Sequence, residues 1–338
     1  MNRYLLIALF LFSFSSCQKV LLEPDYHEGD FFYFENNKAL MPVWVKGNQE
    51  SRTFVIFLHG GPGLTSNTYA NSQAYKKLQE KYAFVFWDQR TSGTSQGNPP
   101  KESLNLDQYV EDTEKLITLI KNKYSVEKVF LIGKSWGGCL GTAYLIKQEN
   151  QDNIYGWVEI DGAHNLKEAV PMSQEWVKNK VQEKISQGEE VSYWEEEMKW
   201  YNSNPEVNTS YQMRHGRNLN KLNGIYLNPE DDPGNGFPFR SPVPILYMFN
   251  ALIVNNNINV AEISLTPEMN KILVPSMVLW GRHDGTLPVA LAYDAFDNLG
   301  TDENSKELHI FENSAHGCSF EEPDLFVERI TAFIEKYK

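Results

Sequence analysis

The stretch Gly133-Lys134-Ser135-Trp136-Gly137-Gly138 is the most informative part of this chain of 338 residues. It follows a short apolar run at residues 129–132, which predicts a buried strand, and precedes a predicted helix at residues 139–148. A serine between a strand and a helix, with a glycine two positions away on each side, is typical of a tight turn that exposes a nucleophilic hydroxyl at a sheet edge. Ser135 is therefore the first candidate for a catalytic residue.

A serine nucleophile needs a base to take its proton and an acid to orient that base. Two further apolar runs, at residues 276–281 and 308–311, predict strands; Asp284 follows the first and His316 follows the second. The chain order Ser135, Asp284, His316 is the α/β-hydrolase order. Asp161, which follows a predicted strand at residues 155–160, is an alternative acid.

A second loop offers hydrogen-bond donors for the reaction. Residues 53–58 predict another strand, and His59-Gly60-Gly61-Pro62-Gly63 follows it. We expect the backbone N–H groups of Gly61 and Trp136 to form an oxyanion hole, and His59 to hold its loop by hydrogen bonds. The remaining histidines are expected to be surface or packing residues: His27, His164, His215, His283 and His309.

Four motifs occur together in the predicted core. They are His59-Gly60-Gly61-Pro62-Gly63, Trp87-Asp88-Gln89-Arg90-Thr91-Ser92-Gly93, the stretch around Ser135, and Gly281-Arg282-His283-Asp284. Together they resemble the proline iminopeptidase (prolyl aminopeptidase) group of the α/β-hydrolase superfamily. The resemblance implies a serine peptidase with Ser135 as nucleophile and with Asp284 and His316 completing the triad. It also implies that Asp88 and Arg90 brace the loop that begins at His59.

The chain departs from that family pattern in two places. Thr91 stands where the family usually has glycine, and Lys134 and Gly138 stand where it often has glycine and serine. The first departure concerns a turn. The second places a long cationic side chain beside the nucleophile, and we expect Lys134 either to point into solvent or to contact a substrate carboxylate.

The predicted fold class is α/β, with an α/β-hydrolase fold: a mostly parallel central sheet, helices on both faces, and an inserted, mainly helical cap (lid). Strands and helices alternate after an opening hairpin at residues 31–34 and 41–45, which argues for such a sheet. The predicted core comprises residues 17–163 and 268–338, and the cap comprises residues 164–267. In iminopeptidases, glutamates of the cap bind the substrate amine, which makes Glu175, Glu196 and Glu197 candidates here.

The N-terminus is predicted to be a targeting segment. Residues 1–16 combine Arg3 with an apolar run too short to span a bilayer, and small residues precede Cys17. This resembles a bacterial lipoprotein signal, which implies cleavage before Cys17 and a lipid on its sulfur. We therefore expect an exported protein of the bacterial cell envelope, anchored at Cys17 and facing the periplasm. An ordinary signal peptide is the alternative.

Composition restricts the partners. A net charge of −13 disfavours nucleic acid and mildly favours cationic ligands. We expect no cofactor and no metal, and we expect Cys139 and Cys318 to be unpaired, largely buried thiols. The predicted function is that of an aminopeptidase acting on short peptides through an acyl-enzyme. An esterase or amidase for small substrates and an inactive binding module remain as alternatives.

Overall fold

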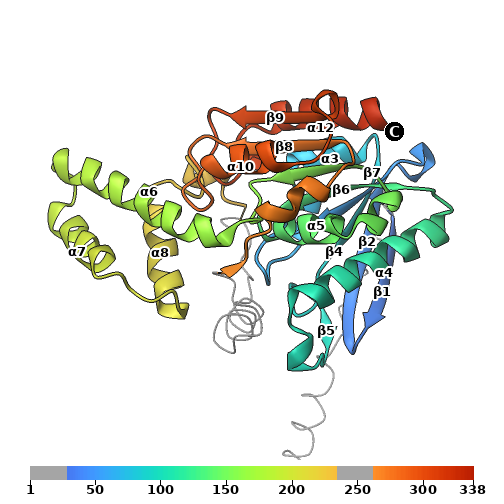
Figure 1. Cartoon of the computed structure of the whole chain (residues 1–338), viewed down its shortest axis with the longest axis horizontal. Coiled ribbons are helices and arrows are strands. Elements are labelled where there is room, and N and C mark those ends of the chain that lie inside the picture. Colours follow the sequence, from blue (N-terminus) through green and yellow to red (C-terminus); the bar gives the residue numbers. More distant parts are fainter. Residues whose placement is uncertain (1–28, 234–261) are drawn as a thin grey trace, which may run out of the picture.

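The computed structural model describes residues 29–233 and 262–338. Within these residues, a nine-stranded sheet has the order β1-β2-β4-β3-β6-β7-β8-β9, and β5 pairs with β2 (Figure 1). The strands are β1 (Asp30–Asn36), β2 (Ala39–Gly47), β3 (Phe54–Leu58), β4 (Ala83–Trp87), β5 (Gln96–Gly97), β6 (Val129–Lys134), β7 (Ile154–Ile160), β8 (Ser276–Gly281) and β9 (Lys306–Phe311). The strands from β4 to β9 in the sheet order pair in parallel, and the opening hairpin is antiparallel. The mostly parallel sheet predicted from the sequence is confirmed.

The parallel strands separate two layers of core. In β3, Phe54, Ile56 and Leu58 belong to one hydrophobic cluster, whereas Val55 and Phe57 belong to another. This division follows from the alternation of side chains across a strand. Every residue of β3, β4, β6 and β8 is buried, and apart from Lys134 at the end of β6 and Ser276 at the start of β8 these strands contain only apolar residues and glycine.

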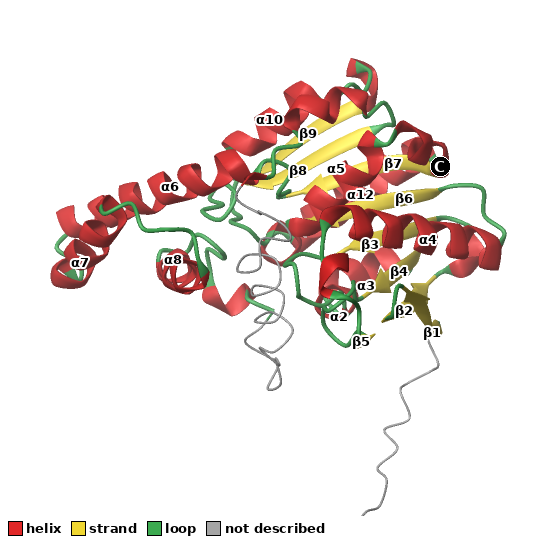
Figure 2. Ribbon diagram, turned by 60° about the horizontal axis from the view of Figure 1, so that its bottom comes forward, coloured by secondary structure: helices red, strands yellow, loops and turns green. Residues whose placement is uncertain are grey.

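Helices cover both faces of the sheet (Figure 2). One cluster includes residues of α4 (Leu106–Tyr124), α5 (Trp136–Ile146) and α10 (Ala290–Asn298), and the other includes residues of α3 (Gln73–Gln79) and α12 (Pro323–Tyr337). The short helices are η2 (Gln49–Ser51), α2 (Asn67–Ala70), η3 (Lys101–Ser103), η4 (Gln148–Asn153), η5 (Pro229–Asp231), η8 (Thr266–Lys271), η9 (Glu303–Ser305) and α11 (Cys318–Glu321).

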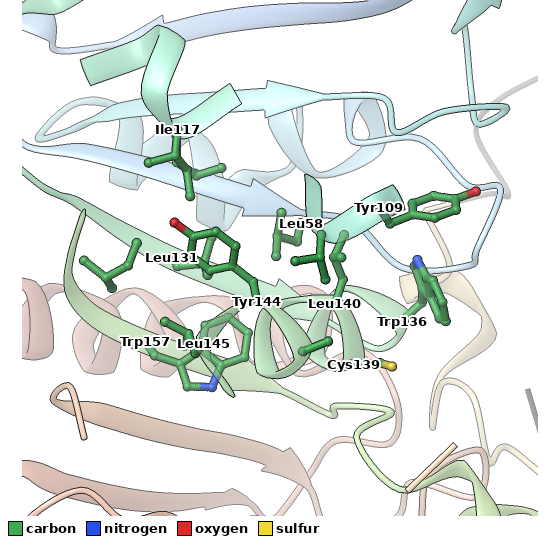
Figure 3. Close-up of a cluster of buried hydrophobic side chains, with 14 of the residues drawn as sticks. Leu58, Tyr109, Ile117, Leu131, Trp136, Cys139, Leu140, Tyr144, Leu145 and Trp157 are labelled. Carbon is green, nitrogen blue, oxygen red and sulfur yellow. The ribbon is translucent and has the colours of Figure 1, made fainter. Parts of the chain in front are cut away.

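The helix α5, which follows Ser135, is packed closely against the sheet. Figure 3 shows Leu140 and Tyr144 of this helix among buried residues such as Leu131 of β6. A Cβ at Gly141 would lie only 2.1 Å from the ring of Trp157 on β7, so the backbone of the helix packs directly on that ring. This packing fixes the N-terminus of α5, and therefore the backbone next to Ser135.

Between β7 and β8 the chain forms three further helices that project to one side of the sheet (Figure 1). They are α6 (Leu166–Ser186), α7 (Val191–Asn202) and α8 (Thr209–Lys221). Their own hydrophobic cluster contains the buried residues Val177, Val181, Trp194, Tyr201, Leu219 and Leu222. These helices lie within the cap predicted for residues 164–267, of which 234–261 fall outside the described residues. The exact limits of the cap stay a prediction.

The two ends of this insertion lie side by side. Asn165 forms an isolated bridge with Ser264, and the N–H of Leu265 donates to the carbonyl oxygen of His164 at 2.8 Å. Within residues 29–233 and 262–338, no helix has the length and apolar character needed to cross a membrane. The predicted signal segment and Cys17 lie outside the described residues.

Candidate active site

The turn at Ser135 has the strained geometry that its sequence predicts. Ser135 lies between β6 and α5 with φ 56° and ψ −118°, in a region that residues with side chains rarely adopt. A Cβ at Gly137 would lie 1.9 Å from the carbonyl oxygen of Leu58, and one at Gly133 would lie 2.2 Å from that of Gly137. Both flanking positions therefore require glycine, and the turn presents Ser135 at the C-terminal edge of the sheet.

The predicted base and acid are in direct contact. Nδ1 of His316, in the loop after β9, lies 2.6 Å from Oδ2 of Asp284, in the loop after β8. The other carboxylate oxygen of Asp284 accepts the backbone N–H groups of Thr286 and Leu287, each at 2.8 Å. Because Nδ1–H donates to Asp284, the proton-accepting lone pair of the neutral ring is on Nε2.

Burial sets the protonation of this pair. It lowers the pKa of His316, and the positive charge of Lys134 lowers it further, while Asp161 acts in the opposite direction. Burial also raises the pKa of Asp284, against the charge of Lys134 and the two backbone N–H groups. His316 is therefore neutral near pH 7 and able to take a proton from a nucleophile.

Asp161, the alternative acid, has other partners. Its Oδ2 lies 2.8 Å from Nζ of Lys134, and its Oδ1 accepts the N–H of Gly281 at 2.8 Å. The geometry thus pairs His316 with Asp284 rather than with Asp161. The expectation of a solvated Lys134 is wrong, because this side chain is buried and its ammonium group is neutralised by Asp161 instead of being presented to a substrate.

The predicted oxyanion loop is held next to Ser135. A Cβ at Gly60 would lie 3.2 Å from Cβ of Ser135, and Gly61 has φ 128°, which favours glycine. Trp136 is the first residue of α5, and the first N–H groups of a helix have no partner within the helix. The N–H of Trp136 is thus suited to a developing negative charge. The roles of Gly61 and Trp136 stay a prediction.

The sequence matches one family over most of its length. Residues 53–323 match the family described as alpha/beta hydrolase fold. The chain belongs to this family. It is therefore an enzyme of the α/β-hydrolase superfamily, and the α/β-hydrolase fold predicted from the sequence is confirmed.

Named relatives of this α/β hydrolase include peptidases. The chain is 24% identical to a probable aminopeptidase of Bacillus subtilis over 317 residues, which cover 88% of this chain and 92% of the relative. It is also 24% identical to a proline iminopeptidase of Thermoplasma volcanium over 317 residues, which cover 91% and 95%. The resemblance to proline iminopeptidases inferred from the motifs is confirmed.

Solved structures of this fold include peptidase-related proteins and esterases. A proline iminopeptidase-related protein of Thermus thermophilus has a TM-score of 0.63 at 20% identity, covering 91% of this chain and 98% of that one. An esterase of Exiguobacterium antarcticum has a TM-score of 0.57 at 17% identity, covering 91% and 99%. At these identities the likenesses concern the fold alone.

Gln89 is a residue of this α/β hydrolase that sequence reasoning did not single out. Its backbone N–H donates to Nε2 of His59 at 3.0 Å, and its side-chain amide donates to the carbonyl oxygen of His59 at 3.0 Å. Its Oε1 accepts the indole N–H of Trp136 at 3.1 Å. Gln89 thus joins the predicted oxyanion loop to the residue after Ser135. Its place between Asp88 and Arg90, in the motif that follows β4, was the available signal.

His59 and Asp88 hold loops of this α/β hydrolase, whereas Arg90 has a different role. Asp88 accepts the backbone N–H groups of Ser66 and Thr94, at 2.9 and 2.7 Å, and so ties together the segments after β3 and β4. Arg90 does not reach the loop at His59, because its guanidinium pairs with Asp112 of α4 at 2.6 and 2.7 Å. The bracing implied for Arg90 is corrected accordingly.

The turn after Arg90 shows the effect of the first departure from the family pattern. Thr91 stands where the family usually has glycine, and its φ is 53°. A threonine in this left-handed region is strained, because its branched Cβ crowds the backbone. Thr91 thus has the backbone conformation that glycine adopts with ease. The replacement of glycine by threonine therefore affects this turn rather than the chemistry.

The three glutamates predicted to bind an amine have different environments. Glu175 is exposed, and the side chain of Glu196 is 79% exposed. Glu197 is buried, and its carboxylate accepts hydrogen bonds from Arg214 and Asn218 of α8, at 2.8 and 2.7 Å. Within the described residues, none of these three side chains forms a hydrogen bond or an ion pair with Ser135, Asp284 or His316. Their role toward a substrate stays a prediction.

The cap nevertheless touches the loops that carry the acid and the base. Ser173 of α6 donates to the carbonyl oxygen of Gly285, the residue after Asp284. The N–H of Gly285 donates to the carbonyl oxygen of Gly224, and the N–H of His316 donates to that of Ile225, at 2.8 and 2.9 Å. The segment after α8 therefore supports the loops that carry Asp284 and His316.

Two further features of the site concern a possible metal ion and the two thiols. Ligand atoms of Asp161, Asp284 and His316 lie within 4.8 Å of one another, which is close enough to hold a metal ion. Lys134 and the Asp284–His316 contact already balance these groups, so their arrangement fits acid–base chemistry without a metal. Cys139 and Cys318 are both buried, as predicted.

Proposed function

We propose that the protein is a serine hydrolase, and more specifically an aminopeptidase that releases an N-terminal residue such as proline from short peptides. The observation that carries the proposal is the 2.6 Å contact between His316 and Asp284, at the sheet edge that presents Ser135. A buried neutral imidazole, an orienting carboxylate and a strained serine turn together match the parts that nucleophilic acyl transfer requires.

In the proposed mechanism, Oγ of Ser135 attacks the substrate carbonyl carbon while Nε2 of His316 takes the hydroxyl proton. The N–H groups of Gly61 and Trp136 stabilise the oxyanion. His316 then gives its proton to the departing amine, which leaves an acyl-enzyme ester at Ser135. Water attacks that ester, and its proton passes through His316 back to Ser135. The products are the released residue and the shortened peptide.

Two observations support an aminopeptidase over other hydrolases. The names of the relatives include an aminopeptidase and proline iminopeptidases. The net charge of −13 favours the approach of a substrate with a protonated amine. An esterase or amidase for small substrates is the second candidate. The environments of the cap glutamates favour this second candidate, because an aminopeptidase needs a carboxylate for the substrate amine. Glu197 is already paired with Arg214, and Glu175 and Glu196 are exposed.

The two candidates are separated by a comparison of aminoacyl esters with a free and with an N-acetylated amine. A protonated amine in a partly desolvated pocket needs a carboxylate, and removing a buried ionic partner is costly. We expect acetylation to lower kcat/KM by roughly 10²–10³-fold for an aminopeptidase. Equal rates on both esters, together with no turnover of aminoacyl arylamides, would favour the esterase. Ser135→Ala serves as the control for contaminating activity.

We also propose that the protein is exported and anchored through a lipid at Cys17. The proposal rests on the apolar run and the small residues that precede this cysteine. A Cys17→Ser variant should appear in the soluble fraction with its activity intact, since a buried acyl chain contributes about 0.8 kcal/mol per CH₂ to membrane binding. A wild-type N-terminus other than Cys17 in the soluble fraction would contradict the proposal.

A further inference from the structure

The ion pair between Lys134 and Asp161 joins the ends of three parallel strands. Lys134 is the last residue of β6, Asp161 follows β7, and Gly281 is the last residue of β8. Asp161 accepts from Lys134 through one carboxylate oxygen and from the N–H of Gly281 through the other, both at 2.8 Å. The pair therefore links the residue before Ser135 to the strand end from which the Asp284 loop begins.

The Lys134–Asp161 ion pair is buried more deeply than is usual for an ion pair that stabilises a fold. The side chains of Lys134 and Asp161 are 4% and 0% exposed, and Asp161 has φ 40°, in the left-handed region. Lysine is rarely buried to this extent. Removing two charges from water costs so much that an apolar pair of similar volume is often at least as stable. Its position beneath the triad therefore points to a role other than stability.

The charges around His316 suggest that role. Polar atoms of Asp161, Asp284 and His316 lie within 4.8 Å of one another, so two carboxylates would stand side by side without a cation. Lys134 supplies that cation, and its ammonium group bonds to Asp161 and not to Asp284. Asp284 is thereby left as the carboxylate that does not bond to this ammonium group, and it is the one that His316 contacts.

We infer that Lys134 is a positioning residue of the proposed serine hydrolase: by pairing with Asp161 it leaves Asp284 as the sole acid for His316 and sets the charge balance in which His316 acts as base. The inference rests on the function proposed above. It assigns to Lys134 a part that the family resemblance does not supply, because the family often has glycine at this position.

The other charged and titratable groups near the pair are consistent with this assignment. Burial raises the pKa of Asp161, and Asp284 raises it further, while Lys134 and His316 lower it. Burial lowers the pKa of Lys134, but Asp161, Tyr69, Asp284 and Cys318 together outweigh that effect. The thiol of Cys318 lies 3.8 Å from Oδ2 of Asp161, and burial raises its pKa, so it stays neutral.

The inference is tested by the pH dependence of covalent labelling with a fluorophosphonate, which needs no knowledge of the natural substrate. Oγ of Ser135 bonds to phosphorus, fluoride leaves and the serine proton passes to His316, so labelling requires neutral His316. Lys134→Met removes a positive charge that lowers the pKa of His316, which should move the labelling midpoint to higher pH by about one unit or more. Lys134→Met combined with Asp161→Asn removes both charges and should return the midpoint to within about half a unit of wild type.

A second buried ion pair provides the matched control. Arg90 and Asp112 are both 0% exposed, and neither is among the charges that act on His316. Asp112→Asn should lower the melting temperature without moving the labelling midpoint, because it breaks a buried pair away from the base. A shift of the midpoint in Asp112→Asn as large as that in Lys134→Met would show that the midpoint responds to a general loss of stability. That result would overturn the inference.

The remaining outcomes separate this inference from the proposed function. Labelling of wild type at Ser135 with an unchanged midpoint in Lys134→Met, or with no return in the double variant, would overturn the role of Lys134 alone. Absence of labelling at Ser135 in wild type would overturn the proposed nucleophile and this inference with it. If Lys134→Met does not fold, Asp161→Asn tests the same ion pair by removing its negative partner. The Lys134 cation then remains, so the labelling midpoint of Asp161→Asn should move to lower pH.

Discussion

At the scale of single residues, the proposed chemistry depends on three side chains that are distant in sequence. Ser135, Asp284 and His316 follow β6, β8 and β9, whose parallel pairing through β7 places their C-terminal ends at one sheet edge. Loops at that edge carry the proposed acid and base, while every residue of β6 and β8 below the edge is buried. Rigid strands can therefore hold a base within hydrogen-bonding distance of its acid.

The first prediction concerns these three residues. Ser135→Ala, His316→Ala and Asp284→Asn should each lower kcat by roughly 10³-fold or more, because a triad acts as one unit. Their melting temperatures should stay near that of wild type. Asp161→Asn should keep most of the maximal rate at its own optimal pH, since Asp161 does not contact His316 directly. A larger loss in kcat for Asp161→Asn than for Asp284→Asn would show that the acid is assigned wrongly.

At the scale of helices and strands, the sequence predicts the features that depend on neighbouring residues alone, such as a buried strand or a tight turn. The wholly buried strands β3 and β8 are continuous apolar runs, and the turn at Ser135 has its glycines at fixed positions. The contacts of polar groups depend instead on which elements become neighbours. Lys134 meets Asp161 because β6 pairs with β7, and Glu197 meets Arg214 because α7 packs near α8. No spacing in the sequence specifies either pairing.

The second prediction concerns the helices α7 and α8. Glu197→Gln should lower the free energy of unfolding by roughly 1–3 kcal/mol, because it removes a charge-assisted hydrogen bond to Arg214 inside the cap. Glu196→Gln is the matched control, since its side chain is 79% exposed, and it should change stability by at most about 0.5 kcal/mol. Urea unfolding measures both values. An increase in KM for Glu197→Gln with unchanged stability would instead assign Glu197 to the substrate amine.

At the scale of the whole molecule, a buried polar cluster joins the core to the cap. His164 lies just before α6, and its ring nitrogens contact Glu159 of β7 at 2.8 Å and Asp294 of α10 at 3.2 Å. Asp294 also accepts from Thr266, at the returning end of the insertion. The cluster therefore fastens one end of the cap to β7 and both ends to α10, so its charge state bears on the stability of the entire fold. Because the whole cap lies between His164 and Asp294 in the sequence, only the folded structure brings them together.

The third prediction follows from the protonation of this cluster. Burial lowers the pKa of His164, but Glu159 and Asp294 outweigh it and raise the pKa to about 9 from an ordinary 6.5. A raised pKa contributes stability that is fully present below pH 6.5 and is lost as the pH rises through 9. At about 1.4 kcal/mol per unit, the contribution is on the order of 3 kcal/mol. The difference in unfolding free energy between wild type and His164→Asn should therefore shrink by about that amount between about pH 6.5 and pH 10. Urea unfolding at several pH values measures it, and a difference that stays constant over this range would mean that His164 is neutral in the folded protein.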